Sequence, residues 1–155
     1  MADSCPLCDK LSKLPGDELV WQFPHSVAFL GSWQYHIGYC VLVSRVHATE
    51  LHRLDAKVRA AFLDEMVVMS QAIDAAFKPC KMNCESLGNQ VPHLHWHLFP
   101  RRADDPEKLQ PVWIGFDRAE RDATEKARLQ SPALPRAEIV ARLRDALSRT
   151  QTATV

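Results

Sequence analysis

The sequence predicts an α+β fold, an antiparallel sheet accompanied by one long helix and a C-terminal helix. Short apolar runs typical of strands occupy residues 18–44, helical periodicity follows at 55–77, and strand-like runs return at 81–99. Strands interrupted by a single helix favour this class over a doubly wound sheet. The 155 residues suit a single domain, which we expect to span 1–150, with a frayed tail at 151–155.

Five segments have the composition of strands. Residues 18–23 and 26–31 flank Pro24, and we expect a turn there because proline cannot donate a hydrogen bond to a sheet. Residues 37–44 are almost continuously apolar, which favours a central strand. The other two are 81–86 and the alternating segment 93–99.

Two segments have the pattern of amphipathic helices. The first should begin near Asp55, a favourable N-cap, and end at Phe77, before Pro79. Its apolar residues recur at spacings of three and four: Val58, Phe62, Met66, Met69, Ile73 and Phe77. The C-terminal helix should begin at Pro135, since proline is favoured in the first helical turn. Between them, residues 117–130 have a charged helical pattern with few apolar anchors.

Composition and charge exclude several classes of protein. Basic and acidic residues number 19 each, so the formal net charge is zero, which argues against a nucleic-acid-binding protein. No apolar run approaches the roughly 20 residues of a membrane span. The first 18 residues are polar and lack the apolar segment of a signal peptide. We therefore expect a cytoplasmic protein with no membrane or nucleic-acid partner, whose five cysteines are reduced thiols or metal ligands.

Three of the seven histidines stand at alternate positions in "HLHWHLF", residues 93–99. On a strand, alternate side chains point to the same face, about 7 Å apart. We therefore expect His93, His95 and His97 to form a row on one face of the sheet, while the apolar residues between them pack into the core. A helix would scatter the three imidazoles around its axis.

Three interpretations of this row remain open. It could be an exposed strand, a zinc site built on a His-x-His pair, or a catalytic site with a nucleophilic imidazole. The last is favoured because Gly88 permits close backbone approach and amide side chains follow it. Arg101 and Arg102 could bind phosphate oxygens or end the strand in solvent. Three aromatic residues could stack on a base or simply pack: Trp33, Tyr35 and Trp113.

The same segment resembles the histidine-triad (HIT) family of nucleotidyl hydrolases and transferases. "HLHWHLF" matches the family pattern His-apolar-His-apolar-His-apolar-apolar at every position. "GYCVLVSRVHATEL" (38–51) is similar to the family's strand, basic residue and His-x-x-x-Leu. "LGNQVPHLHWHLFPR" (87–101) is similar to a bacterial subgroup labelled diadenosine-tetraphosphate hydrolases. The resemblance covers about residues 5–115 and none of the C-terminal forty.

The resemblance implies a fold, a mechanism and a partner. The fold is a five-stranded antiparallel sheet with two helices, commonly paired as a homodimer. His95 attacks the α-phosphorus of a nucleotide, and water hydrolyses the resulting nucleotidyl-histidine intermediate. His97 contacts the phosphate and assists proton transfer, and His93 orients the group. No cofactor is required for this covalent route.

Substrate contacts are also implied by the resemblance. Asn89 and Gln90 stand where the family binds phosphate, and Asn83 matches an Asn that helps to position the site. One position departs from the pattern, since Gly31 stands where many members carry an acidic residue that holds the ribose hydroxyls. Ser32 or Gln34 could take its place.

Cys5 and Cys8 form a C-x-x-C pair, which is compatible with a redox pair, half a zinc site or two unmodified thiols. Some bacterial relatives bind structural zinc through such a pair and two histidines, and the matching positions here are His47 and His93. Four sulfur and nitrogen ligands would form a closed tetrahedral site.

The main hypothesis is therefore a nucleotidyl hydrolase acting on dinucleoside polyphosphates, nucleoside phosphoramidates or related compounds. A nucleotidyl transferase uses the same chemistry. A second hypothesis is a nucleotide sensor or scaffold with little turnover, which the glycine at position 31 favours. A third is a zinc protein in which the triad itself holds the metal.

Overall fold

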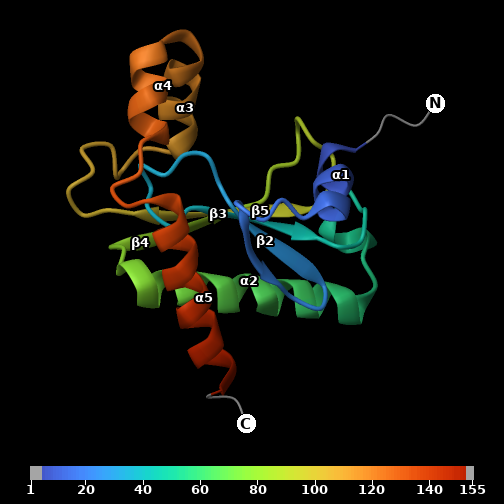
Figure 1. Ribbon diagram of the computed structural model, residues 1–155. Coiled ribbons are helices and arrows are strands. Elements are labelled where there is room, and N and C mark those ends of the chain that lie inside the picture. Colours follow the sequence, from blue (N-terminus) through green and yellow to red (C-terminus); the bar gives the residue numbers. More distant parts are fainter. Residues whose placement is uncertain (1–4, 153–155) are drawn as a thin grey trace.

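A computed structural model describes residues 5–152 and contains a five-stranded antiparallel sheet with the strand order β1-β2-β3-β5-β4 (Figure 1). The fold class predicted from the sequence is thereby confirmed. The strands are β1 (Leu19–Gln22), β2 (Ser26–Leu30), β3 (Cys40–Ser44), β4 (Lys81–Glu85) and β5 (His95–Arg101). The α-helices are α1 (Pro6–Lys13), α2 (Ala56–Phe77), α3 (Val112–Arg121), α4 (Ala123–Gln130) and α5 (Arg136–Thr152), with a 3₁₀ turn η1 (Leu51–Arg53) before α2.

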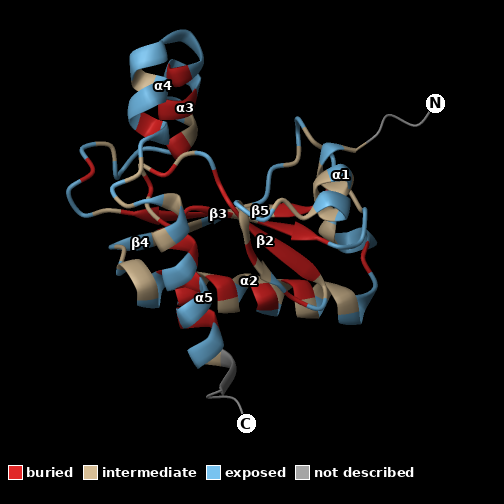
Figure 2. Ribbon diagram, in the orientation of Figure 1, coloured by how far each residue is buried: buried red, intermediate tan, exposed pale blue. Residues whose placement is uncertain are grey.

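The sheet has helices on both faces (Figure 1). The long helix α2 and the C-terminal helix α5 pack on one face, over the largest group of buried apolar residues. On the opposite face, α1 lies at one end and the hairpin of α3 and α4 rises at the other. The central strands β2, β3 and β5 are the most buried part of the chain, as the colouring of Figure 2 shows.

Helix α2 begins and ends close to the predicted positions. The Asp55 side chain caps it by accepting from the Lys57 N–H at 2.9 Å. The third strand begins at Cys40 rather than Ile37, because residues 34–38 form a turn closed by the Gln34 side chain.

Helix α1 was not expected from the sequence. Pro6 occupies its first turn, and Leu7, Leu11 and Leu14 pack against Phe29 of β2 and its neighbours. At the other end of the chain, α5 extends to Thr152, and the rest of the predicted frayed tail, 153–155, lies outside the described residues. No helix in the described part of the chain is long and apolar enough to cross a membrane.

Candidate active site

His95 and His97 lie on the face of β5 that carries α1 and α3, as the alternation predicted. They stand beside Val43 and Val41 of β3, which belong to the same face. Trp96 between them points to the opposite face, where it packs against the core beneath α2. Packing on one face of β5 therefore holds the two imidazoles on the other.

The prediction that His93 continues this row is wrong. Strand β5 begins at His95, and His93 lies in the preceding bend, where its N–H donates to the Val91 carbonyl. The His93 side chain is 1% exposed, and its Nε2 lies 2.8 Å from the Ser44 carbonyl oxygen. Its Nδ1 consequently faces the N-terminal cysteines rather than His95 and His97.

The carbonyl oxygen of His93 nevertheless orients the middle histidine. His95 Nδ1 lies 2.6 Å from that oxygen, and a carbonyl can only accept, so Nδ1 carries the proton. In the neutral ring, Nε2 then carries the lone pair. This Nε2 lies 3.1 Å from Nε2 of His97. A nucleophilic nitrogen is thus held in a fixed direction beside a second imidazole.

His97 is held in its neutral form by its surroundings. Burial, and then the nearby His95, lower the pKa of His97 to about 4. Its ring meets the Trp113 indole edge-on at 5.1 Å between centroids and stacks near Phe99 at 5.8 Å. A neutral imidazole can hold a proton on one nitrogen and accept on the other, as general acid–base catalysis requires.

A cavity of about 510 Å³ opens over His95 and His97, a volume typical of small-molecule sites. Its walls come from the turn after β2, the loop before β5 and helix α3. The lining residues are Trp33, Leu87, Gly88, Asn89, Gln90, Val91, His95, His97, Trp113, Phe116, Asp117 and Glu120. The lining combines aromatic rings with polar side chains, which suits a ligand with a flat base and a polar phosphate.

Two of the three predicted substrate-binding residues line the cavity, and the third does not. Asn89 and Gln90 lie on the wall of the cavity, on the loop that Gly88 turns with a φ of +75°. Asn83 lies on β4, where its Oδ1 accepts a hydrogen bond from Arg101 at 3.2 Å. It is not among the described residues that line the cavity.

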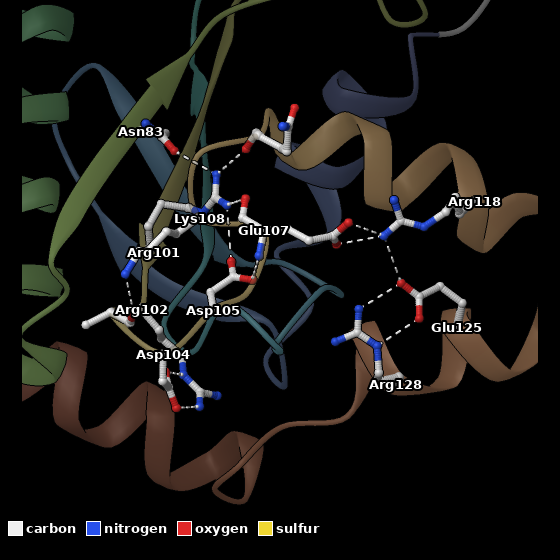
Figure 3. Close-up of polar contacts among 12 residues, drawn as sticks. Asn83, Arg101, Arg102, Asp104, Asp105, Glu107, Lys108, Arg118, Glu125 and Arg128 are labelled. Atoms are coloured by element: carbon white, nitrogen blue, oxygen red, sulfur yellow. Dashed lines mark hydrogen bonds and ion pairs between the residues drawn. The ribbon is translucent and has the colours of Figure 1, made fainter.

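Arg101 has neither of the roles considered from the sequence. Its side chain is buried and donates to the Asp105 carboxylate, the Asn83 side chain and the carbonyls of Glu107 and Gln110 (Figure 3). Arg102 is partly exposed and pairs with Asp104. Both guanidinium groups therefore serve the loop after β5 rather than the cavity.

The turn after β2 explains the glycine at position 31. A Cβ on Gly31 would stand 2.1 Å from the Tyr39 ring, so no acidic side chain fits there. Gln34 is fully buried and donates to the carbonyls of Gly31 and Tyr39, so it is wrong as a substitute ribose ligand. Ser32 is exposed and is not among the described residues lining the cavity.

The four predicted metal ligands lie together beside the active site. One ligand atom from each of Cys5, Cys8, His47 and His93 can be chosen so that all lie within 4.8 Å of one another. Cys5 Sγ lies 3.4 Å from His93 Nδ1, and Cys8 Sγ lies 3.3 Å from His47 Nδ1.

These donors fit a zinc ion. Tetrahedral zinc with ligands at about 2.0–2.3 Å has ligand–ligand edges of about 3.3–3.8 Å, which the sulfur–nitrogen distances match. Hydrogen bonding of His93 Nε2 to the Ser44 carbonyl fixes the orientation of the ring and leaves Nδ1 as the ligand atom. The geometry does not support the hypothesis that the triad itself holds the metal, because His93 Nδ1 faces the cysteines rather than His95 and His97.

Comparison with known proteins agrees with these features. A family model described as the HIT domain matches residues 15–104. The chain belongs to the HIT domain family. Membership indicates a nucleotide-binding hydrolase or transferase.

Individual HIT proteins match over most of their length. The chain is 24% identical to Protein hit of Bacillus subtilis in an alignment of 131 residues that covers 72% of this chain and 90% of the relative. A histidine triad protein from Bradyrhizobium japonicum superposes with a TM-score of 0.65 at 28% identity, covering 89% of this chain and 93% of that one. A zinc-bound HIT protein from Mycobacterium smegmatis shares the fold, with a TM-score of 0.69 at 17% identity and 97% coverage of both chains.

Sequence reasoning missed part of the cavity wall. Phe116, Asp117 and Glu120 come from α3, in a region whose charged pattern gave no sign of a site. The available signal was the pair Trp113 and Phe116, which are three apart and therefore lie on one helical face.

Proposed function

We propose that this HIT protein is a nucleotidyl hydrolase in which His95 attacks the α-phosphorus of a nucleotide and forms a nucleotidyl-histidine intermediate. The observation that carries the proposal is the fixed tautomer of His95. Its Nδ1 is bound to the His93 carbonyl at 2.6 Å, so Nε2 carries the lone pair of a ring that lines a cavity of nucleotide size.

The proposed reaction has two steps, formation and hydrolysis of the nucleotidyl-histidine intermediate. His95 Nε2 forms a bond to phosphorus as the bond from phosphorus to the leaving group breaks. His97 Nε2, which lies 3.1 Å from His95 Nε2, donates a hydrogen bond to the leaving group, and the leaving group takes its proton from water. Water then attacks phosphorus, breaks the P–N bond and releases a nucleoside monophosphate. The electron pair of the P–N bond returns to Nε2, which restores neutral His95 with its proton on Nδ1, and the proton that the attacking water loses goes to solvent.

We also propose two classes of substrate for this reaction. Dinucleoside polyphosphates and nucleoside phosphoramidates both place an α-phosphorus beside a leaving group that accepts a proton. Asn89 and Gln90 supply amide donors for the phosphoryl oxygens, and Trp33 and Trp113 supply flat surfaces for a base. The diadenosine-tetraphosphate hydrolase subgroup stays a prediction from the segment 87–101.

Kinetics of a His95→Ala variant test the hydrolase. We expect kcat on diadenosine tetraphosphate or an adenosine phosphoramidate to fall by at least about 10³-fold, since covalent catalysis is lost. His52→Ala changes an exposed histidine outside the cavity and should keep wild-type rates. Circular dichroism checks that both variants fold. Turnover by His95→Ala within tenfold of wild type would contradict the proposal.

Two other functions are separated by product analysis. A nucleotidyl transferase would pass the nucleotidyl group to an acceptor such as phosphate, giving a nucleoside diphosphate in place of the monophosphate. A sensor would bind adenosine monophosphate in calorimetry and release no product from any substrate of the panel. If the protein is a hydrolase, it should both bind adenosine monophosphate and release a nucleoside monophosphate from a substrate.

We further propose that Cys5, Cys8, His47 and His93 bind one structural zinc ion. Four sulfur and nitrogen ligands leave no open position for substrate, so the metal would fasten α1 to the bend before β5. Elemental analysis should find about one zinc per chain, lost in Cys5→Ser/Cys8→Ser and kept in Cys80→Ser. Equal zinc content in the first variant and wild type would contradict this site.

We also propose a homodimer formed through the edge strand β4. Beside β4 lies a groove of about 460 Å³, lined by Met66, Val67, Met82 and neighbouring residues. Val67 is 46% exposed on α2, and an unpaired strand edge together with an apolar groove favours pairing with a second copy. Light scattering should give twice the chain mass of 17.6 kDa, and the single-chain mass would contradict the dimer.

A further inference from the structure

Tyr39 lies beneath the active site and touches one of its histidines. It is 3% exposed, at the end of the turn before β3. Its ring stacks on Phe99 with 4.1 Å between centroids, and its hydroxyl lies 2.8 Å from His97 Nδ1. The hydroxyl of a buried tyrosine usually finds such a partner, and here the partner belongs to the triad.

The direction of each hydrogen bond follows from the one fixed acceptor. The His93 carbonyl places the proton of His95 on Nδ1, so His95 Nε2 can only accept. His97 Nε2 must then donate across the 3.1 Å contact. The neutral His97 ring has its lone pair on Nδ1, where the Tyr39 hydroxyl donates.

We infer that Tyr39 is a positioning residue that fixes His97 in the tautomer protonated on Nε2. Only the catalytic consequence of this inference rests on the proposed function. Without the hydroxyl, the proton of His97 could move to Nδ1, and Nε2 could no longer donate to His95 or to a leaving group. Burial raises the pKa of Tyr39, which keeps its hydroxyl protonated and able to donate.

The position of the Tyr39 ring also explains why glycine stands at position 31, where many family members carry an acidic residue. The Tyr39 ring occupies the space into which a side chain at Gly31 would project, since a Cβ there would stand 2.1 Å from the ring. The Tyr39 backbone is fixed as well, because its carbonyl accepts from the Gly31 N–H at 2.9 Å. Glycine at position 31 is therefore what allows a tyrosine to reach His97.

The His97 tautomer can be measured directly by two-bond ¹H–¹⁵N correlation in ¹⁵N-labelled protein at pH 7. In the wild type we expect a protonated Nε2 and an unprotonated Nδ1. In Tyr39→Phe the Nδ1 proton should appear in a substantial fraction of molecules. Tyr35→Phe makes the same chemical change away from the triad and should leave His97 as in the wild type.

Kinetics of the same variants complete the test. Tyr39→Phe should lower kcat about tenfold and change KM less than twofold, because the hydroxyl acts through His97 and touches no substrate. Gly31→Ala should shift the His97 tautomer in the same direction by displacing the ring. An Nδ1-protonated His97 in the wild type, or an unchanged tautomer in Tyr39→Phe, would overturn the inference. The expected tautomers in a protein without turnover would instead uphold it and refute the proposed hydrolase.

Discussion

The buried Arg101 side chain stabilises the loop after β5. Its guanidinium is buried at the end of β5 and pairs with Asp105 at 3.1 Å, with side-chain exposures of 4% and 3%. Further bonds to the carbonyls of Glu107 and Gln110 fasten the loop that leads into α3 (Figure 3). Because α3 forms a wall of the cavity, this arginine supports the site without facing it.

Removal of Arg101 should therefore destabilise the fold. We expect Arg101→Ala to lose about 3–5 kcal/mol in free energy of unfolding, because Asp105 is left as an unpaired buried charge. Arg102→Ala breaks the partly exposed pair with Asp104 and should cost at most about 1 kcal/mol. Urea denaturation of both variants measures the difference, and equal losses would contradict a structural role specific to Arg101.

At the scale of elements, α3 brings acidic side chains to the wall of the cavity. Trp113 fastens α3 to β4 by donating from Nε1 to the Glu85 carboxylate. One turn further, Asp117 and Glu120 bring two carboxylates to the wall, and no lysine or arginine is among the described lining residues. Carboxylates near a phosphate-binding site repel polyphosphates over about 10 Å at moderate salt.

Neutralising these carboxylates should favour anionic substrates. We expect Asp117→Asn/Glu120→Gln to lower KM for diadenosine tetraphosphate several-fold at low salt, with a smaller effect at high salt. Glu138→Gln/Asp145→Asn removes two carboxylates from α5 on the other face of the sheet and should leave KM unchanged. Steady-state kinetics at two salt concentrations provide the comparison. An equal decrease in both variants would show a general charge effect rather than one of α3.

Local periodicity explains which elements the sequence could predict. The alternation in β5 and the spacing in α2 are properties of neighbouring residues, so both were predictable. The eight residues of α1 are too few to form a stable helix alone, and contact with β2 decides their structure. The bend at His93 likewise depends on the distant Ser44 carbonyl, which no local pattern reveals.

For the whole molecule, buried neutral histidines link folding to pH. Burial, and then nearby arginines led by Arg101, lower the pKa of His36 to about 4 from 6.5, although Asp105 partly opposes this effect. Between pH 6.5 and 4 the unfolded chain therefore binds more protons at this position than the native one. Stability consequently rises with pH across this window and falls on acidification.

Acid unfolding should reveal this contribution. As the pH falls from 7 to about 4, His36 should remove up to about 3 kcal/mol from the free energy of unfolding. Denaturation at several pH values should show a shallower loss in His36→Gln than in wild type. The matched variant His52→Gln changes an exposed histidine and should keep the wild-type slope. A wild-type slope in His36→Gln would contradict this account.

Covalent trapping tests the central claim most directly. Wild-type protein is mixed with a nucleotide labelled at the α-phosphorus, quenched within milliseconds in base, where phosphoramidates survive, and digested for peptide mapping. We predict acid-labile label on the peptide containing His95, and none in His95→Ala. Rapid turnover without any labelled peptide, or label that persists in His95→Ala, would contradict a nucleophilic role for His95.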